Sequence, residues 1–202
     1  MIKTELANMK ICPAHTVTIE NEVNIELIIK QYEFVSEEIL SKFREVKNRW
    51  ITETYLYLVN HRIVSFVVMM EENLKCGFLH YHIASEHKEY FIKNYPALDK
   101  KINQILYVYT DVNYRRNGLA TQLIDFVLKD MFKRNFNYVW LKKETHSQIY
   151  EKLGFKNFLK ATEEILSNDA EQFFQDYKQR FGYDSVSLIR RYNDIRLVKI
   201  LP

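Results

Sequence analysis

The chain has 202 residues, 47% of them hydrophobic and 27% charged, which suits a single globular domain with a sizeable core. Its formal net charge of +3 comes from 29 basic and 26 acidic residues spread along the sequence, so neither a nucleic-acid-binding stripe nor a membrane-binding tail is expected. The two cysteines form no CxxC pattern, and no run of 18 apolar residues occurs. We therefore expect a soluble, cytoplasmic protein without a membrane partner or a disulfide framework.

The start of the chain combines a strand pattern with two helix patterns. Polar and apolar residues alternate over His15–Glu20 as in a half-buried strand, and apolar residues then recur at helical spacing over Asn24–Val35. Ser36, with two glutamates behind it, predicts the N-cap of a second helix that extends to about Asn48.

The middle of the chain predicts an antiparallel hairpin. Its two arms, Thr54–Val59 and Ile63–Met70, are rich in β-formers and are separated by three residues. We expect a further strand over Gly77–Ala84 and a helix over Glu86–Tyr95, which ends before Pro96.

The second half predicts a strand over Gln104–Thr110, an amphipathic helix that ends near Lys133, and a strand over Asn137–Leu141. A strand-helix-strand unit of this length has parallel strands, so an α/β or α+β fold with a mixed sheet follows. A helix over Asn168–Phe181 and a closing strand over Ile195–Leu201 complete the chain.

The segment Asp111–Ala120 (DVNYRRNGLA) lies where a predicted strand turns into an amphipathic helix. The first N–H groups of a helix have no helical partner and its dipole favours an anion, while Gly118 is small and Arg115 and Arg116 are cationic. These features favour a phosphate site, although the same pattern also fits an ordinary turn with solvated arginines. Neither a P-loop nor a Rossmann glycine pattern is present.

A second motif, Tyr150–Phe155 (YEKLGF), follows after the helix and the next strand. In this order and spacing the two motifs resemble the GNAT superfamily of acetyltransferases, whose signature [QR]-x-x-G-x-[GA] matches Arg115–Ala120. The resemblance is most specific over residues 104–158 and implies one GNAT-like domain over residues 1–202. The implied fold is an α/β (α+β) one, with a mixed, twisted sheet whose central parallel strands splay apart between flanking helices.

The resemblance also implies the cosubstrate and its contacts. Acetyl-CoA would bind without a metal, and its pantetheine arm would pair with the main chain of Val108, Tyr109 and Thr110. Backbone amides would hold the pyrophosphate, and they belong to Arg115, Arg116, Asn117, Gly118, Leu119, Ala120 and Thr121. Tyr150 would be the general acid that protonates the departing thiolate, and the alternative is a core tyrosine that anchors its helix.

Two functional residues stay open because the chain departs from the family pattern. The segment Lys142–Ile149 lacks the Asn that often contacts the pantetheine, and Thr145, His146 or Ser147 would take its place. Relatives often carry a catalytic Glu early in the second parallel strand, where this chain has Trp140 and Lys142. The candidate general bases are Glu71, Glu72, His80 and His82.

The resemblance predicts an N-acetyltransferase that moves the acetyl group of acetyl-CoA to a primary amine of a small molecule or a protein by direct attack. The acceptor is not identified, and a homodimer is left open. The alternatives are a catalytically silent acetyl-CoA-binding sensor and a toxin-type aminoacyl-tRNA acetyltransferase. The even charge distribution disfavours a nucleic-acid partner, because neutralising several phosphates needs a clustered basic face.

Overall fold

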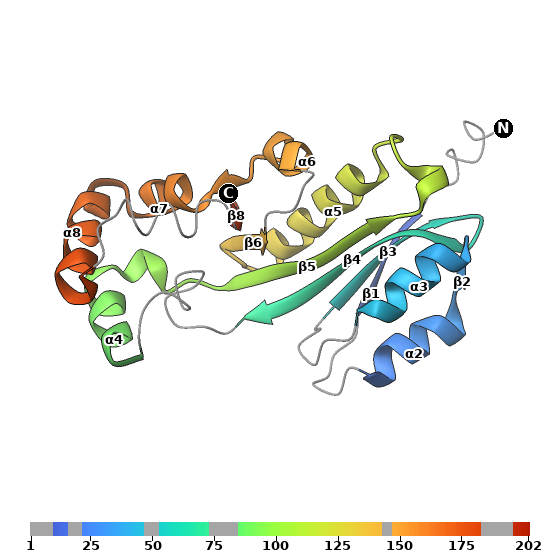
Figure 1. Cartoon of the computed structure of the whole chain (residues 1–202), viewed down its shortest axis with the longest axis horizontal. Helices are drawn as coiled ribbons and strands as arrows, with labels where there is room; N and C mark the ends of the chain where they lie inside the picture. The colour runs from blue at the N-terminus through green and yellow to red at the C-terminus, as the bar shows by residue number, and fades with distance from the viewer. Residues whose placement is uncertain (1–9, 16–21, 47–52, 73–84, 143–146, 183–195) are drawn as a thin grey trace. The chain divides into compact units, whose positions relative to one another are not determined.

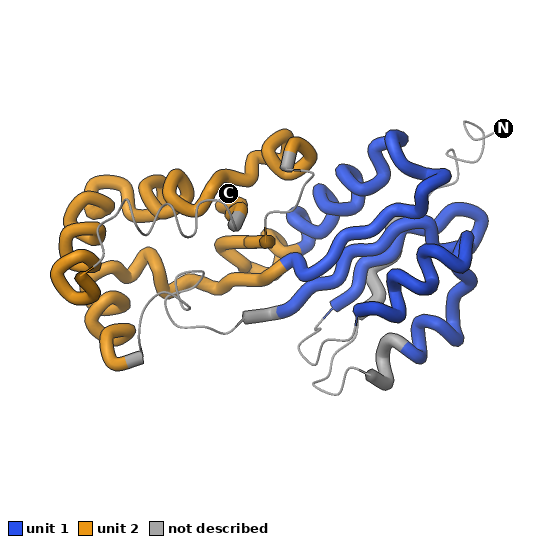
Figure 2. Tube along the Cα trace, viewed as in Figure 1, with its two compact units in different colours: residues 1–71, 105–130 blue, residues 72–104, 131–202 orange. Residues whose placement is uncertain are grey.

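The computed structural model describes residues 10–15, 22–46, 53–72, 85–142, 147–182 and 196–202 (Figure 1). The chain forms two compact units, shown in Figure 2: residues 1–71 with 105–130, and residues 72–104 with 131–202. Strand β5 (Ile102–Thr110) belongs to both, since it begins in the second unit and ends in the first. The expectation of one domain over residues 1–202 stays a prediction.

The first unit is built on antiparallel strands between helices. Its strand order is β1-β3-β4-β5, and the short strand β2 pairs with β4 in parallel. The strands are β1 (Lys10–His15), β2 (Glu33–Phe34), β3 (Glu53–Val59) and β4 (Arg62–Glu72). The described helices are α2 (Glu22–Gln31), α3 (Glu37–Glu45) and α5 (Leu119–Lys133), together with the 3₁₀ turn η4 (Val112–Tyr114).

The predicted hairpin is confirmed, with a tighter turn than expected. Strands β3 and β4 pair antiparallel, and Val59 lies opposite Arg62, so two residues rather than three form the turn. Both turn residues, Asn60 and His61, have positive φ angles of 49° and 63°. This is the pattern of a type I′ turn, whose twist matches that of the flanking strands.

Strand β3 has a helix on each of its faces, because successive side chains point in opposite directions. The Tyr55 hydroxyl donates to the Asp130 carboxylate of α5 at 2.7 Å. The next residue, Leu56, is buried in a cluster with Ile39 and Phe43 of α3. The strands of this unit therefore lie between α5 and α3 (Figure 1).

The second unit contains the antiparallel strand order β6-β8-β7 and the remaining described helices. Its strands are β6 (Tyr138–Lys142), β7 (Lys156–Asn157) and β8 (Arg196–Ile200). Its helices are α4 (Ser85–Asn94), α6 (Ser147–Lys152), α7 (Phe158–Leu166) and α8 (Ala170–Phe181), and its 3₁₀ turns are η3 (Pro96–Leu98) and η5 (Ser167–Asp169). Parallel and antiparallel pairs together confirm the predicted mixed sheet with flanking helices.

Most expected elements within the described ranges are confirmed, with shifted ends. The first strand is described at Lys10–His15, earlier than expected, and residues 16–20 of the predicted one lie outside the described residues. The strand predicted over residues 77–84 also lies outside them. Helix α7 was not expected, although Asn157 caps it by accepting from the Lys160 N–H at 2.9 Å.

An aromatic cluster holds α4 against α8 in the second unit. Phe91 of α4 is fully buried, and its ring lies edge-on to that of Phe173, with 5.4 Å between the centroids. At the margin of this cluster, Tyr90 and Tyr95 donate hydrogen bonds to the same Asp176 oxygen at 2.6 and 2.8 Å. These two hydrogen bonds exist only in the folded protein, and they stabilise the ionised form of the Asp176 carboxyl group there.

We expect Asp176→Asn to flatten the acid side of the stability profile. The Tyr90 hydrogen bond, together with that of Tyr95, holds the pKa of Asp176 below its usual value. This stabilisation is present above the unfolded-state pKa of about 3.9 and is lost as pH falls through the lower folded-state pKa. Melting temperatures followed by circular dichroism should therefore fall less steeply below about pH 4 in the variant than in the wild type. Asp99→Asn, at an exposed aspartate of the same unit, serves as the control, and identical profiles for Asp176→Asn and wild type would contradict the assignment.

Candidate functional site

A buried carboxylate marks where β5 ends and the loop before α5 begins. The Asp111 side chain is fully buried, and its Oδ1 accepts from the Asn113 N–H at 3.0 Å. Its Oδ2 accepts from the Ser36 hydroxyl, and its own N–H donates to the Val64 carbonyl of β4 at 2.9 Å. Ser36 is also the predicted N-cap of α3, because its Oγ accepts from the Ile39 N–H. Asp111 thus joins the loop to both α3 and β4.

The loop itself presents a run of unused backbone donors. Within the described ranges, the N–H groups from Arg116 to Thr121 have no protein acceptor. The Arg115 N–H differs, because it donates to the Val112 carbonyl at 3.4 Å. Arg116 and Gly118 have left-handed φ angles of 64° and 77°, a geometry that turns successive N–H groups toward one point. The arrangement can bind an anion such as a phosphate at the start of α5.

The backbone conformation at position 118, and not a lack of space, requires a glycine there. A Cβ atom there would lie 3.7 Å from Gln122 Nε2, which is an ordinary contact. The φ angle of +77° is nevertheless one that residues with a side chain rarely adopt. The glycine of the motif therefore preserves the direction of the N–H groups.

The Arg115 guanidinium turns back onto β5 in place of facing the loop. Its Nε donates to the Thr110 carbonyl at 3.0 Å and its Nη2 to the Tyr109 hydroxyl at 3.2 Å. Glu38 of α3 lies 3.8 Å from the same Nη2 and accepts from the Tyr109 hydroxyl. Partial burial, with the Glu38 hydrogen bond second, raises the pKa of Tyr109 to about 12. The Arg116 side chain is exposed and carries the cationic charge of the loop itself.

The backbone groups at the end of β5 point to two sides of the strand. The Tyr109 carbonyl accepts from the Ser65 hydroxyl of β4 at 2.8 Å, so the backbone of Tyr109 faces β4. Because backbone groups alternate in direction along a strand, those of Val108 and Thr110 face the other side. The pantetheine contacts assigned to these three residues stay predictions.

The second motif forms the C-terminal end of helix α6, in the second unit. The Phe155 N–H donates to the Tyr150 carbonyl at 3.0 Å, and the Gly154 N–H donates to that of Glu151 at 2.9 Å. Gly154 has a left-handed φ of 81°, and the rings of Tyr150 and Phe155 meet edge-on, with 5.7 Å between centroids. These contacts are those of a Schellman motif, including its apolar contact. The Tyr150 ring therefore anchors the helix end, and the acid role expected of its hydroxyl stays a prediction.

The other residues proposed from the sequence are only partly described. Glu71 and Glu72 end strand β4, and Ser147 begins α6, but the side chains of all three lie outside the described part of the structure. The two histidines proposed as bases, His80 and His82, and the proposed pantetheine contacts Thr145 and His146 lie outside the described residues altogether.

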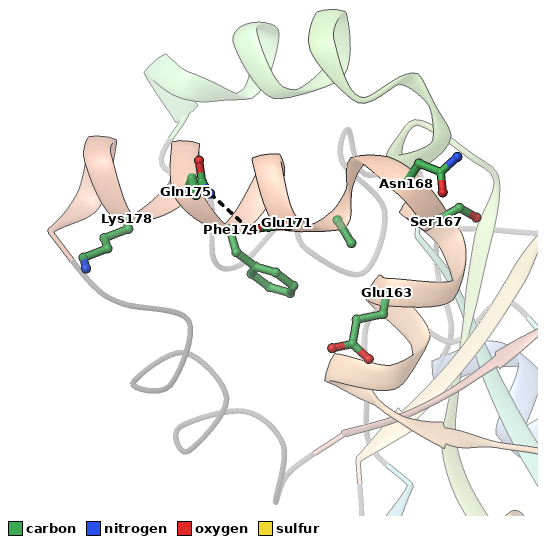
Figure 3. Close-up of a pocket in the computed structure, with 8 residues that line it drawn as sticks. Glu163, Ser167, Asn168, Glu171, Phe174, Gln175 and Lys178 are labelled. Carbon is green, nitrogen blue, oxygen red and sulfur yellow. Dashed lines mark hydrogen bonds between the residues drawn. The ribbon is translucent and has the colours of Figure 1, made fainter.

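A cavity of about 670 Å³ lies between α7 and α8 in the second unit (Figure 3). Carboxylates, an aromatic ring and a lysine line it, and the residues are Glu163, Ser167, Asn168, Ala170, Glu171, Phe174, Gln175 and Lys178. No sequence motif pointed to it, because one wall residue, Glu163, comes from the unexpected helix α7 and most of the others are positions of α8 without a motif.

Among the described residues, no group of three or more His, Cys, Asp or Glu could hold a metal ion. In the same ranges, no helix has both the length and the apolar content needed to cross a membrane.

A family model described as the Acetyltransferase (GNAT) family matches residues 28–155, which is more than half of the chain. The chain belongs to the GNAT acetyltransferase family. The predicted family and enzyme class, an acetyl-CoA-dependent N-acetyltransferase, are thereby confirmed. Both the loop and the Y-E-K-L-G-F element lie within the matched residues. No curated protein matches the chain.

Several solved structures of GNAT proteins are similar to this chain. The GNAT family N-acetyltransferase YhbS from Escherichia coli, in complex with CoA, is 12% identical, with a TM-score of 0.46, over 96% of this chain and 83% of that one. An agmatine N-acetyltransferase is 12% identical, with a TM-score of 0.46, over 95% and 100%. NAA60 from Arabidopsis thaliana, in complex with acetyl-CoA, is 17% identical, with a TM-score of 0.43, over 73% and 85%. Likenesses at this level do not identify the acceptor of this GNAT protein.

We expect Gly118→Ala to weaken the binding of CoA by about tenfold or more, which is about 1.4 kcal/mol. A side chain at a φ of +77° strains the loop and redirects the N–H groups that would hold the pyrophosphate. Gly182→Ala is the matched control, because Gly182 has a φ of +70° with nothing within 4 Å, but lies at the end of α8. Both variants should lose similar thermal stability, and calorimetry should show weaker CoA binding for Gly118→Ala alone. Equal CoA affinity in the two variants would remove the loop from the donor site.

Proposed function

We propose that this GNAT protein transfers the acetyl group of acetyl-CoA to a primary amine of a small molecule or a protein, by direct attack. The observation that carries the proposal is the run of backbone N–H groups from Arg116 to Thr121, which have no protein acceptor within the described ranges. Such a run at a helix start suits a pyrophosphate, and acetyl-CoA contains one.

The donor contacts that we propose divide among backbone and side-chain groups. The backbone amides from Arg116 to Thr121 hold the pyrophosphate. The Arg115 N–H is engaged with Val112 and its guanidinium with β5 and Glu38, so Arg115 supports the loop and Arg116 supplies the positive charge. The main chain of Val108, Tyr109 and Thr110 pairs with the pantetheine arm. Among these, Val108 and Thr110 have backbone groups that point away from β4, and of the two the Thr110 carbonyl already accepts from Arg115 Nε.

Acetyl-CoA supplies the thioester, and groups of the protein would stabilise the charge that develops and transfer the protons. A neutral amine forms a bond to the thioester carbonyl carbon, the C–S bond breaks, and the amine loses a proton to a base that is not assigned. A backbone N–H of β5 would stabilise the charge on the carbonyl oxygen. The Tyr150 hydroxyl would give its proton to the departing thiolate, while its ring keeps the contact with Phe155. No covalent enzyme intermediate is needed.

The setting of this reaction is part of the proposal. A reducing cytoplasm suits a chain with two cysteines and no CxxC pattern. The acceptor is a primary amine of unassigned identity, and no metal takes part in the proposed steps.

The substitution Tyr150→Phe separates an enzyme from a silent acetyl-CoA sensor. It removes one hydroxyl and keeps the ring that contacts Phe155, so folding and acetyl-CoA affinity should not change. If the hydroxyl is the general acid, kcat for thiol release with the best amine acceptor should fall by about 10² to 10⁴. Tyr150→Leu is the companion variant, which also removes the ring and should lower the melting temperature. Equal rates for wild type and Tyr150→Phe would exclude the acid role, and a wild type that binds acetyl-CoA but acetylates no amine would favour the sensor.

A further inference from the structure

Gln122 is a side chain at the loop that neither the motif nor the resemblance singled out. It is the fourth residue of α5 and is exposed to solvent. Its Oε1 accepts a hydrogen bond from the Tyr57 hydroxyl at 3.1 Å. The Tyr57 ring is only 2% exposed and comes from β3, so the partner of the carboxamide is rigidly held.

In the structure the oxygen of the Gln122 carboxamide faces the Tyr57 hydroxyl. A phenol that donates must meet the carboxamide oxygen, which leaves the Nε2 group, with its two N–H donors, on the other side. Burial raises the pKa of Tyr57, so the phenol keeps its proton at neutral pH. Within the described ranges, the Gln122 Nε2 group has no protein acceptor.

The Nε2 group lies over the glycine of the loop. It is 3.7 Å from the position that a Cβ of Gly118 would occupy. Helical side chains lean toward the helix N-terminus, so a side chain at the fourth position reaches back over the first turn. The free Nε2 donors and the unused backbone N–H groups therefore lie at the same end of α5.

We propose that Gln122 donates a hydrogen bond from Nε2 to the pyrophosphate bound at this loop, and that Tyr57 is the positioning residue that orients the carboxamide. This inference rests on the proposed donor site and adds a side-chain contact to it. A neutral donor held in this way recognises a phosphate oxygen by the direction of its hydrogen bond. The reversed carboxamide would place its oxygen toward the phosphates and repel them.

The test compares three ligands: CoA, 3′-dephospho-CoA, which lacks only the 3′-phosphate, and pantetheine, which lacks the pyrophosphate together with the adenosine. Gln122→Ala should weaken CoA and 3′-dephospho-CoA by roughly tenfold to a hundredfold, the usual value of a hydrogen bond to a charged group, and leave pantetheine unchanged. Gln122→Glu, which has the same shape, should weaken the first two ligands further, because it brings a carboxylate to the pyrophosphate. Gln175→Ala, at an exposed glutamine of α8, is the control and should bind all three as the wild type does.

A double-mutant cycle tests the positioning role of Tyr57. Tyr57→Phe should weaken CoA less than Gln122→Ala does, because the carboxamide remains but is no longer oriented. The double variant should bind CoA as Gln122→Ala alone does, since Tyr57 acts through Gln122. Additive losses would overturn the positioning role.

Three results would overturn the proposal for Gln122. These are unchanged CoA affinity in Gln122→Ala, an equal loss for pantetheine, and a loss that disappears with 3′-dephospho-CoA, which would move the contact to the 3′-phosphate. A failure of the donor site as a whole looks different. In that case the wild type would bind CoA no better than pantetheine, and Gly118→Ala would bind CoA as the wild type does.

Discussion

The buried carboxylate of Asp111 is the contact on which the geometry of the donor loop depends. It ends strand β5, caps the turn that follows, and accepts from the hydroxyl that also caps helix α3. A buried polar side chain is costly unless hydrogen bonds satisfy it, so the donors from Ser36 and Asn113 must stay where they are, and the bond from the Asp111 N–H to the Val64 carbonyl holds the same point to β4. The loop therefore begins at a fixed point, and the left-handed residues Arg116 and Gly118 can turn its N–H groups in one direction.

Around this loop, structural and functional demands fall on the same residues. Arg115 matches the family signature, yet its guanidinium is held by Thr110, Tyr109 and Glu38 and so braces the end of β5 against α3. In the other motif, Tyr150 and Phe155 form the apolar contact of a Schellman cap, and Gly154 supplies its left-handed residue. Much of the pattern Y-E-K-L-G-F is thus explained by how a helix ends. A catalytic role needs only the tyrosine hydroxyl, which the cap does not require.

Elements with a local physical cause could be predicted from the sequence. The Ser36 cap, the hairpin and helix α5 follow from capping chemistry, β-propensity and apolar spacing, and the structure contains all three. Helix α7 was overlooked although its signals are local, because Asn157 precedes a segment whose buried residues include Phe158, Ala161 and Leu166. The extra residue expected in the hairpin turn reflects Arg62, which is polar and exposed but pairs within the sheet.

The sequence by itself determined the family and the position of the donor loop, because the motif lies within one stretch of chain and its glycine answers a local backbone requirement. Only the tertiary structure decided which side chains complete that loop. Ser36 reaches Asp111 across 75 positions and Tyr57 reaches Gln122 across 65, and neither pair has a spacing that a helix or strand period would reveal. Of the three groups that hold the Arg115 guanidinium, Glu38 likewise comes from a distant part of the chain, on another helix. Such contacts arise when the sheet brings distant segments together, and each then satisfies a polar group whose partner no local pattern could indicate.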